Sequence, residues 1–192
     1  MPGHAVEVKP VNLGSFEPEF VACSPFRKMP GFRDGDFAIS DSSAIIAYLE
    51  TKFPAPPLIP VEASRRARTI WYEEFADTIL IPCIGKAFFN RVVAPRFLKR
   101  EGDLVVAEKA ENEELPPLLA YIESMMPASG FLVDDRLTLA DLAVASPFVN
   151  MQHLGIRLDA GKYPKTAAFV QAMLTRPSFA ALIVKEKLFL SR

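Results

Sequence analysis

The spacing of hydrophobic and polar positions changes near residue 54. Before it, one stretch alternates apolar and polar side chains, as a half-buried strand does, and a later stretch repeats apolar residues at helical spacing. Between them, Asp34-Gly35-Asp36 separates two short apolar runs, which is a strong hairpin signal. The pattern predicts a small α/β unit with a strand at 6–11, a short helix at 16–22, hairpin strands at 31–33 and 37–39, and a helix from 42 to about 53.

Four prolines stand among residues 54–60, where a helix cannot continue. We therefore expect residues 1–53 to form one domain, residues 54–61 to be a stiff linker and residues 62–192 to be all-helical. The helical region should contain helices at 62–90 (kinked near Pro82), 103–126, 163–174 and 179–187. In one interpretation, the Pro116-Pro117 pair splits the helix at 103–126 into two helices.

A helix-start signal precedes a strongly apolar run in the second half. Thr138 stands three residues before Asp141. The Thr138 hydroxyl can accept from the backbone N–H of Asp141, and the Asp141 carboxylate can accept from the backbone N–H of Thr138. Leu137 and Leu142 occupy the flanking apolar positions. Because the run that follows is apolar on most sides, this helix should be central in its bundle. We interpret the motif as a folding device without a catalytic role.

Composition excludes several classes of protein. The 192 residues are 50% hydrophobic and 23% charged, and the net charge of −1 argues against a general nucleic-acid binder. There is no apolar run of about 20 residues and no leader sequence at the start, so we expect a cytoplasmic protein that does not use the membrane. Cys23 and Cys83, like His4 and His153, lack metal-ligand spacing, which predicts no metal and no Ser-His-Asp hydrolase.

Two features between residues 24 and 50 suit a small anionic ligand. Met29-Pro30 fixes the backbone, because proline restricts both itself and the residue before it. Asp41-Ser42 opens an apolar helix, and the N–H groups and dipole of a helix start attract carboxylates or phosphates. By themselves, Asp41 and Ser42 also fit an ordinary cap and turn.

Five segments in consistent order make the chain similar to the cytosolic glutathione transferases. They are SPFRKMPGF, ISDSSAIIAYLETKFP, WYEEFADTILIP, LTLADLAVASP and YPKTAAFVQAMLTRPSF. The resemblance covers roughly residues 6–182. It implies a thioredoxin-like N-terminal domain followed by a helical-bundle C-terminal domain.

The resemblance also implies a glutathione site. The Met29–Pro30 bond is expected to be cis, and the Met29 backbone to hold the cysteinyl part of glutathione as an added strand would. Asp41 and Ser42 match positions that bind the γ-glutamyl end, with Ser42 toward its carboxylate and Asp41 toward its ammonium group. Lys28 is placed to reach a ligand carboxylate, and a solvated lysine is nearly as good an interpretation.

Family members begin with a strand and a helix ahead of the segment that resembles residues 6–14. The loop between those elements carries the Tyr, Ser or Cys that acts on the glutathione thiol. The given chain starts too late to include them, so we expect an N-terminally incomplete thioredoxin-like domain. The thiol-activating residue is unknown: Ser15, Cys23 and Ser24 are close in sequence, but none matches the family position.

The implied function is conjugation of glutathione, as co-substrate, to small hydrophobic electrophiles, a detoxification reaction. Trp71 and Phe75 are candidates for the second-substrate pocket, and bundle core is the alternative for both. Two other functions stay open: a glutathione-dependent thiol/disulfide reductase, and a non-catalytic interaction module on the same scaffold. A homodimer is expected by resemblance.

Overall fold

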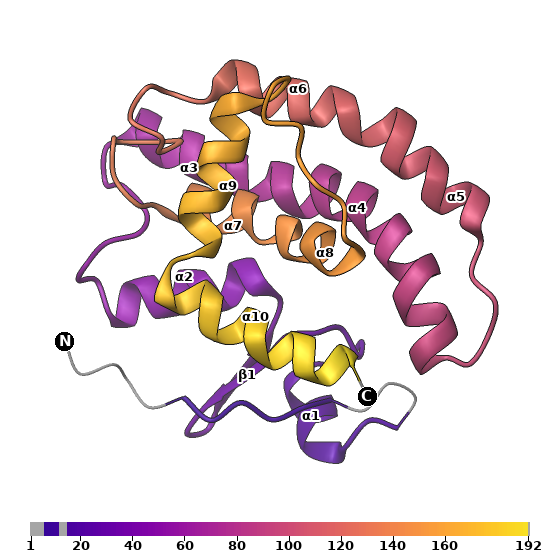
Figure 1. The fold of residues 1–192 in the computed structure, drawn as a ribbon. Helices are drawn as coiled ribbons and strands as arrows, with labels where there is room; N and C mark the ends of the chain where they lie inside the picture. The colour runs from indigo at the N-terminus through magenta and orange to yellow at the C-terminus, as the bar shows by residue number, and fades with distance from the viewer. Residues whose placement is uncertain (1–5, 12–14, 192) are drawn as a thin grey trace. The chain divides into compact units, whose positions relative to one another are not determined.

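The computed structural model describes residues 6–11 and 15–191. The chain divides into two compact units, Met1–Pro56 (unit 1) and Pro57–Arg192 (unit 2), and each is described by itself. Figure 1 traces the α/β elements of unit 1 and the helices of unit 2. The predicted class, a small thioredoxin-like α/β domain followed by a helical domain, is confirmed.

Unit 1 is built around one hairpin. Its elements are α1 (Pro18–Cys23), β1 (Gly31–Asp34), β2 (Phe37–Ser40) and α2 (Ser42–Lys52). The strands are antiparallel, with Gly31 opposite Ser40 and Asp34 opposite Phe37. The two residues between them make the turn, and Gly35 supplies the φ of +60° that it requires. The predicted hairpin and the helix after it are confirmed.

The strand predicted at residues 6–11 is wrong. The segment has no regular structure, and Val6 and Val8 are 72% and 83% exposed. Alternation gives a segment an apolar face, but a strand also needs a neighbour that satisfies its backbone N–H and C=O groups. In the described part of the chain, β1 and β2 pair with each other in a two-stranded sheet. Residues 12–14, where the strand was expected to end, lie outside the described residues.

Aromatic and charged contacts attach α2 to the hairpin. The Tyr48 ring stacks on Phe37 at 4.5 Å between centroids and contacts Phe32 at 5.8 Å. Its hydroxyl donates to Asp34 at 2.9 Å, and Lys52 forms an ion pair with the same carboxylate. Hydrogen bonds from Lys52 and Tyr48 lower the pKa of Asp34. One residue at the end of β1 therefore fixes the helix that begins after β2.

Unit 2 is helical. Its first long helix joins α3 (Ala63–Phe75), the π-helical segment η1 (Ala76–Leu80), α4 (Ile81–Phe88) and the π-helical η2 (Phe89–Phe97). The second joins α5 (Leu104–Lys109), η3 (Ala110–Glu114) and α6 (Leu115–Met125). They are followed by α7 (Leu139–Ala145), α8 (Pro147–Leu154), α9 (Pro164–Leu174) and α10 (Pro177–Leu190).

Each π-helical segment lies beside a proline. Pro82 follows η1, Pro95 lies inside η2, and Pro116 follows η3. Proline donates no hydrogen bond and its ring collides with the carbonyl four residues earlier, and the wider π turn accommodates both effects. The helix therefore continues from Leu104 to Met125, so the single helix predicted at 103–126 is confirmed and the alternative split at Pro116-Pro117 is not. The first helix also continues past residue 90, where its end was predicted.

The central position of α7 is confirmed. It contacts α3, α8 and α9, and Ala140, Val144 and Ala145 are completely buried. These residues belong to one continuous core that α3, α4, α6, α8 and α9 complete.

The capping box at the start of α7 is present as predicted. The buried Asp141 carboxylate accepts from the Thr138 N–H at 2.8 Å and from the Thr138 hydroxyl at 3.0 Å. It also accepts from the Leu132 N–H at 2.8 Å, a bond to the preceding loop that the local motif does not predict. Burial raises the pKa of Asp141, and these hydrogen bonds oppose the rise. The carboxylate thus joins loop and helix.

The later part of the linker is held by unit 2. The Pro57 carbonyl accepts from Arg136 at 2.6 Å, and the Leu58 carbonyl accepts from the Leu139 N–H at 2.9 Å. Glu62 then caps α3 through the backbone N–H groups of Ser64 and Arg65, both at 3.0 Å.

Among the described residues, no single helix is long and apolar enough to cross a membrane. The pair α9 and α10 reaches that length and composition only together, across an 81° bend. The inner face of α9 is buried in the core of unit 2 through Phe169, Val170 and Met173.

Thr138→Ala should lower the free energy of unfolding by about 1 kcal/mol or somewhat more, because it removes the N-cap of a buried helix. Denaturant melts measure the loss. Thr78→Ala is the control: its exposed hydroxyl donates to the Glu74 carbonyl at 2.6 Å, and the change should stay within about 0.5 kcal/mol. Equal melts for Thr138→Ala and the wild type would contradict the capping role.

The Glu62 cap predicts a pH dependence. Hydrogen bonds from Ser64 and Arg65 lower the pKa of Glu62 from 4.5 to about 2. Because the folded pKa is lowered, the contribution to stability is complete above pH 4.5 and is lost as the pH falls toward 2. Glu62→Gln should therefore lower Tm at pH 6, and the difference from wild type should shrink in acid. Exposed Glu101→Gln is the control, and a Tm difference that does not change with pH would refute the charge-dependent cap.

Candidate functional site

The open end of the hairpin brings the two predicted anion-binding segments together. The Met29–Pro30 peptide bond is cis, as the resemblance implied. The Pro30 carbonyl accepts from the Asp41 N–H at 3.3 Å, beside the paired residues Gly31 and Ser40. The backbone of Met29 and the start of α2 are therefore neighbours, although ten residues lie between Pro30 and Asp41 in the sequence.

A buried serine fixes the loop that leads into this end. The Ser24 hydroxyl accepts from the Lys28 N–H at 3.0 Å and donates to the Lys28 carbonyl at 2.7 Å, and Ser24 is fully buried. Arg27, inside the loop, has a φ of +59°. The sequence pointed to Ser24 as a residue near the thiol-activating position, and it did not predict the role of Ser24 in positioning Lys28 and Met29. The Ser24-Pro25 pair, which favours a turn start, was the available signal.

Asp41 occupies an unusual backbone conformation at the start of α2. Its φ of +83° and ψ of 128° are rare for a residue with a side chain, and such strain is concentrated at ligand sites. Its carboxylate accepts from the Ala44 N–H at 3.1 Å, so the ordinary cap is present. Ser42 is the first helical residue. Beyond the Asp41 carboxylate at the N-cap, the first turn of α2 carries no acidic side chain.

Lys28 and Met29 lie on the surface at this end, and Met29 is 57% exposed. A peptide-like ligand that runs beside Met29 would meet its backbone edge first and then the start of α2. All five predicted residues of unit 1, Lys28, Met29, Pro30, Asp41 and Ser42, therefore belong to one end of the hairpin.

Close contact with α1 fixes the base of the same hairpin. A Cβ added to Gly31 would lie 3.1 Å from the Cys23 Cβ and 3.3 Å from the Phe20 ring, so a side chain there would require α1 to shift by a few tenths of an ångström. Cys23 is buried, and its sulfur lies 3.9 Å from an Arg33 nitrogen. Neither Cys23 nor the fully buried Ser24 presents a group at the surface of the site.

The two predicted residues of unit 2 lie in an aromatic cluster. Trp71 is 41% exposed and stacks on Phe75 at 5.7 Å, and both rings contact Tyr121. The Arg68 guanidinium lies 5.9 Å from the Trp71 ring centre. Phe75 is 5% exposed and packs against Trp71, whereas Trp71 is partly exposed.

Within the described residues, no three side chains of His, Cys, Asp or Glu gather as a metal site requires. The polar groups at the open end of the hairpin are backbone groups, the Asp41 carboxylate, the Lys28 ammonium group and hydroxyls, which suit an organic zwitterion.

Comparison with known protein families identifies the family of this chain. Residues 1–57 match the family "Glutathione S-transferase, N-terminal domain", and residues 79–177 match "Glutathione S-transferase, C-terminal domain". The second match alone covers more than half of the chain. The protein belongs to the glutathione S-transferase family. The predicted family is thereby confirmed.

Individual relatives agree with this assignment. Glutathione S-transferase theta-3 of Mus musculus is 30% identical over 156 residues, which are 79% of this chain and 63% of the mouse protein. A stringent starvation protein A homolog of Coxiella burnetii is 24% identical over 179 residues, or 93% of this chain and 79% of that protein. The chain thus spans less than two thirds of the length of the mouse transferase.

A solved structure shows the same fold. Ure2p5 from Phanerochaete chrysosporium, cocrystallized with 1-(S-glutathionyl)-2,4-dinitrobenzene, superimposes with a TM-score of 0.81 at 22% identity. The match covers 97% of this chain and 84% of the fungal one.

Ser24→Ala should loosen the loop without unfolding the protein. It removes the partner of the partly buried Lys28 N–H, and an ordinary intramolecular hydrogen bond contributes about 0.5–1.5 kcal/mol. Hydrogen exchange at the Lys28 amide should become faster by a factor of up to about ten, since 1.4 kcal/mol is a factor of ten. Thr51→Ala, which removes an exposed hydroxyl from α2, should leave this exchange rate unchanged. Equal protection of Lys28 in Ser24→Ala would contradict the positioning role.

Proposed function

We propose that the open end of the hairpin binds glutathione and that the protein conjugates its thiol to small hydrophobic electrophiles. The observation that supports this best is the bond from the Asp41 N–H to the Pro30 carbonyl, which places the Met29 backbone beside the start of α2. Family membership supplies the ligand class.

In this proposal the Met29 N–H and C=O pair with the cysteinyl unit as a neighbouring strand would. The γ-glutamyl carboxylate lies at the N-terminus of α2 near Ser42, where the helix dipole favours negative charge. Asp41 attracts the ammonium group, and Lys28 reaches a second carboxylate. Trp71, supported by Phe75, offers a flat apolar surface to an aromatic electrophile.

The chemical step needs the thiolate of glutathione, because the thiol itself is a poor nucleophile. Sulfur forms a bond to the electrophilic carbon, a leaving group such as chloride departs, and the thiol proton passes to solvent. No side chain of the described residues is assigned to lower the pKa of that thiol. Binding is therefore the better supported half of the proposal.

Specific observations distinguish the two alternative functions. A thiol/disulfide reductase requires an accessible thiolate. Cys23 and Cys83 are both buried, and burial raises the pKa of the Cys83 thiol, which disfavours a reductase built on either. A non-catalytic interaction module stays the other alternative, and retention on immobilised glutathione with no turnover would support it. The homodimer and the cytoplasmic location stay predictions.

Asp41→Asn tests the glutathione site while it preserves the cap. Asparagine tolerates positive φ and keeps an oxygen for the Ala44 N–H, but it lacks the charge that attracts an ammonium group. A lost hydrogen bond to a charged group is worth about 1.5–3 kcal/mol, so titration calorimetry should show glutathione affinity about tenfold weaker or more. N-acetylglutathione, which has no ammonium group, should bind the variant and the wild type equally.

Asp36→Asn is the matched control, because it removes an equivalent exposed charge at the opposite end of the hairpin. Formation of 1-(S-glutathionyl)-2,4-dinitrobenzene from 1-chloro-2,4-dinitrobenzene tests the transferase activity separately. A wild-type protein that binds no glutathione at millimolar concentration would refute the site. Binding without conjugation would refute only the transferase.

A further inference from the structure

Unit 2 contains a cavity of about 190 Å³ between α4, α8 and α10, apart from the proposed glutathione site. Its walls are mainly apolar: Ile81 from α4, Val149 from α8, and Phe179 and Ile183 from α10. It shares no residue with the open end of the hairpin or with the Trp71 cluster. All of its lining residues belong to unit 2.

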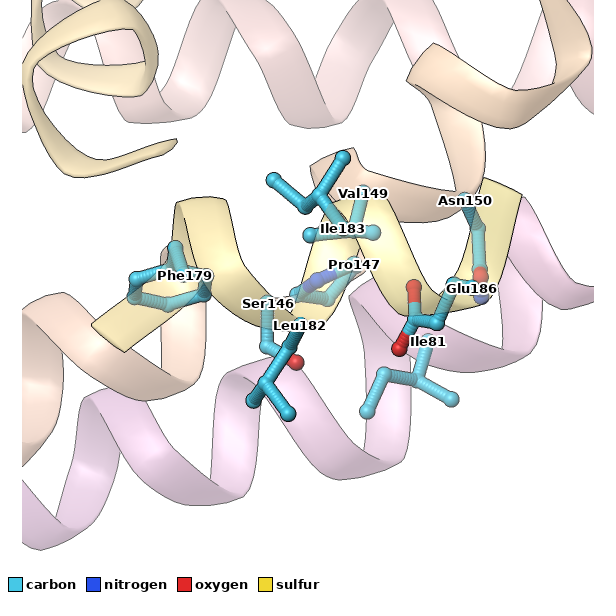
Figure 2. Close-up of a pocket in the computed structure, with 9 residues that line it drawn as sticks. All are labelled: Ile81, Ser146, Pro147, Val149, Asn150, Phe179, Leu182, Ile183 and Glu186. Carbon is cyan, nitrogen blue, oxygen red and sulfur yellow. The ribbon is translucent and has the colours of Figure 1, made fainter. Parts of the chain in front are cut away.

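The cavity has one polar end. Figure 2 shows Asn150 and Glu186 close together beside Ile81, with Phe179 at the opposite end. The Glu186 carboxylate is 2.8 Å from His153 Nε2. The His153 side chain is only 3% exposed, so it forms a fixed anchor that keeps the carboxylate at the rim.

Size and charge together define the class of ligand. An apolar cavity of about 150 Å³ is known to hold benzene, so about 190 Å³ accommodates one ring with a short substituent. Drug-sized ligands need about 300 Å³ or more. A carboxylate that accepts only one bond from His153 retains lone pairs for a further donor, and the Asn150 amide oxygen adds an acceptor.

We propose that this cavity binds small amphipathic cations, with a single aromatic or aliphatic group between Ile81, Val149 and Ile183 and an ammonium group at Glu186 and Asn150. The site goes beyond the proposed conjugation reaction, because its polar end selects for positive charge and it needs no glutathione.

Three probes of one shape test the charge preference: benzylammonium, benzyl alcohol and benzoate, titrated into the full-length protein and followed by NMR. Benzylammonium should bind up to about fivefold more tightly than the alcohol, because the Glu186 side chain is 51% exposed and an exposed ion pair is weakened by solvent, and benzoate should bind least. Equal affinities for the ammonium and the alcohol would overturn the proposal.

Two variants locate the site. Glu186→Gln should abolish the preference for benzylammonium over the alcohol, whereas exposed Glu108→Gln, with the same change in net charge, should preserve it. Ser146→Leu places a larger side chain into the cavity from its exposed edge and should weaken both probes about tenfold or more. A preference for benzylammonium that survives Glu186→Gln, or binding unchanged in Ser146→Leu, would refute the site. An unchanged thermal melt for each variant shows that the fold is intact.

Discussion

One backbone hydrogen bond organises the open end of the hairpin in unit 1. Where Asp41 donates to the Pro30 carbonyl, the hairpin closes, a cis peptide bond lies on one side and a helix begins on the other. The surroundings support that bond from several directions. Ser24 holds the incoming loop, Gly31 lets the backbone approach α1, and Tyr48 attaches α2 to the strands. The site is therefore mostly backbone, and side chains position it.

In unit 2, the polar backbone groups at buried helix ends also need hydrogen-bond partners. The Asp141 carboxylate does this for α7 with three hydrogen bonds, one of them to the preceding loop. Burying a carboxylate is costly, and the raised pKa of Asp141 reflects that cost. The cost is tolerated because each acceptor position meets a donor that would otherwise be unsatisfied.

Much of this structure could be predicted because its elements depend on residues that are close together in the sequence. The Asp-Gly-Asp turn, the α2 start and the Thr138–Asp141 capping box each depend on residues a few positions apart, so sequence patterns define them. Partners remote in sequence were not predictable in the same way. Residues 6–11 alternate correctly, but no strand pairs with them in the described part of the chain, and the bonds from Ser24 to Lys28 and from Leu132 to Asp141 depend on how loops fold back. The helix through Pro116-Pro117 continues because a π turn absorbs the prolines, which spacing alone does not reveal.

The π-helical segment η1 also explains the spacing of the buried face of the first long helix. Tyr72, Ala76, Leu80 and Ile84 are all at most 3% exposed, and they repeat every four residues. In an α-helix each residue rotates by about 100°, so steps of four overshoot a full turn and three steps move the side chain about 120° around the axis. A π turn rotates less per residue and cancels part of this drift. The segment beside Pro82 thus allows a repeat of four to stay on one side of the helix, facing the core.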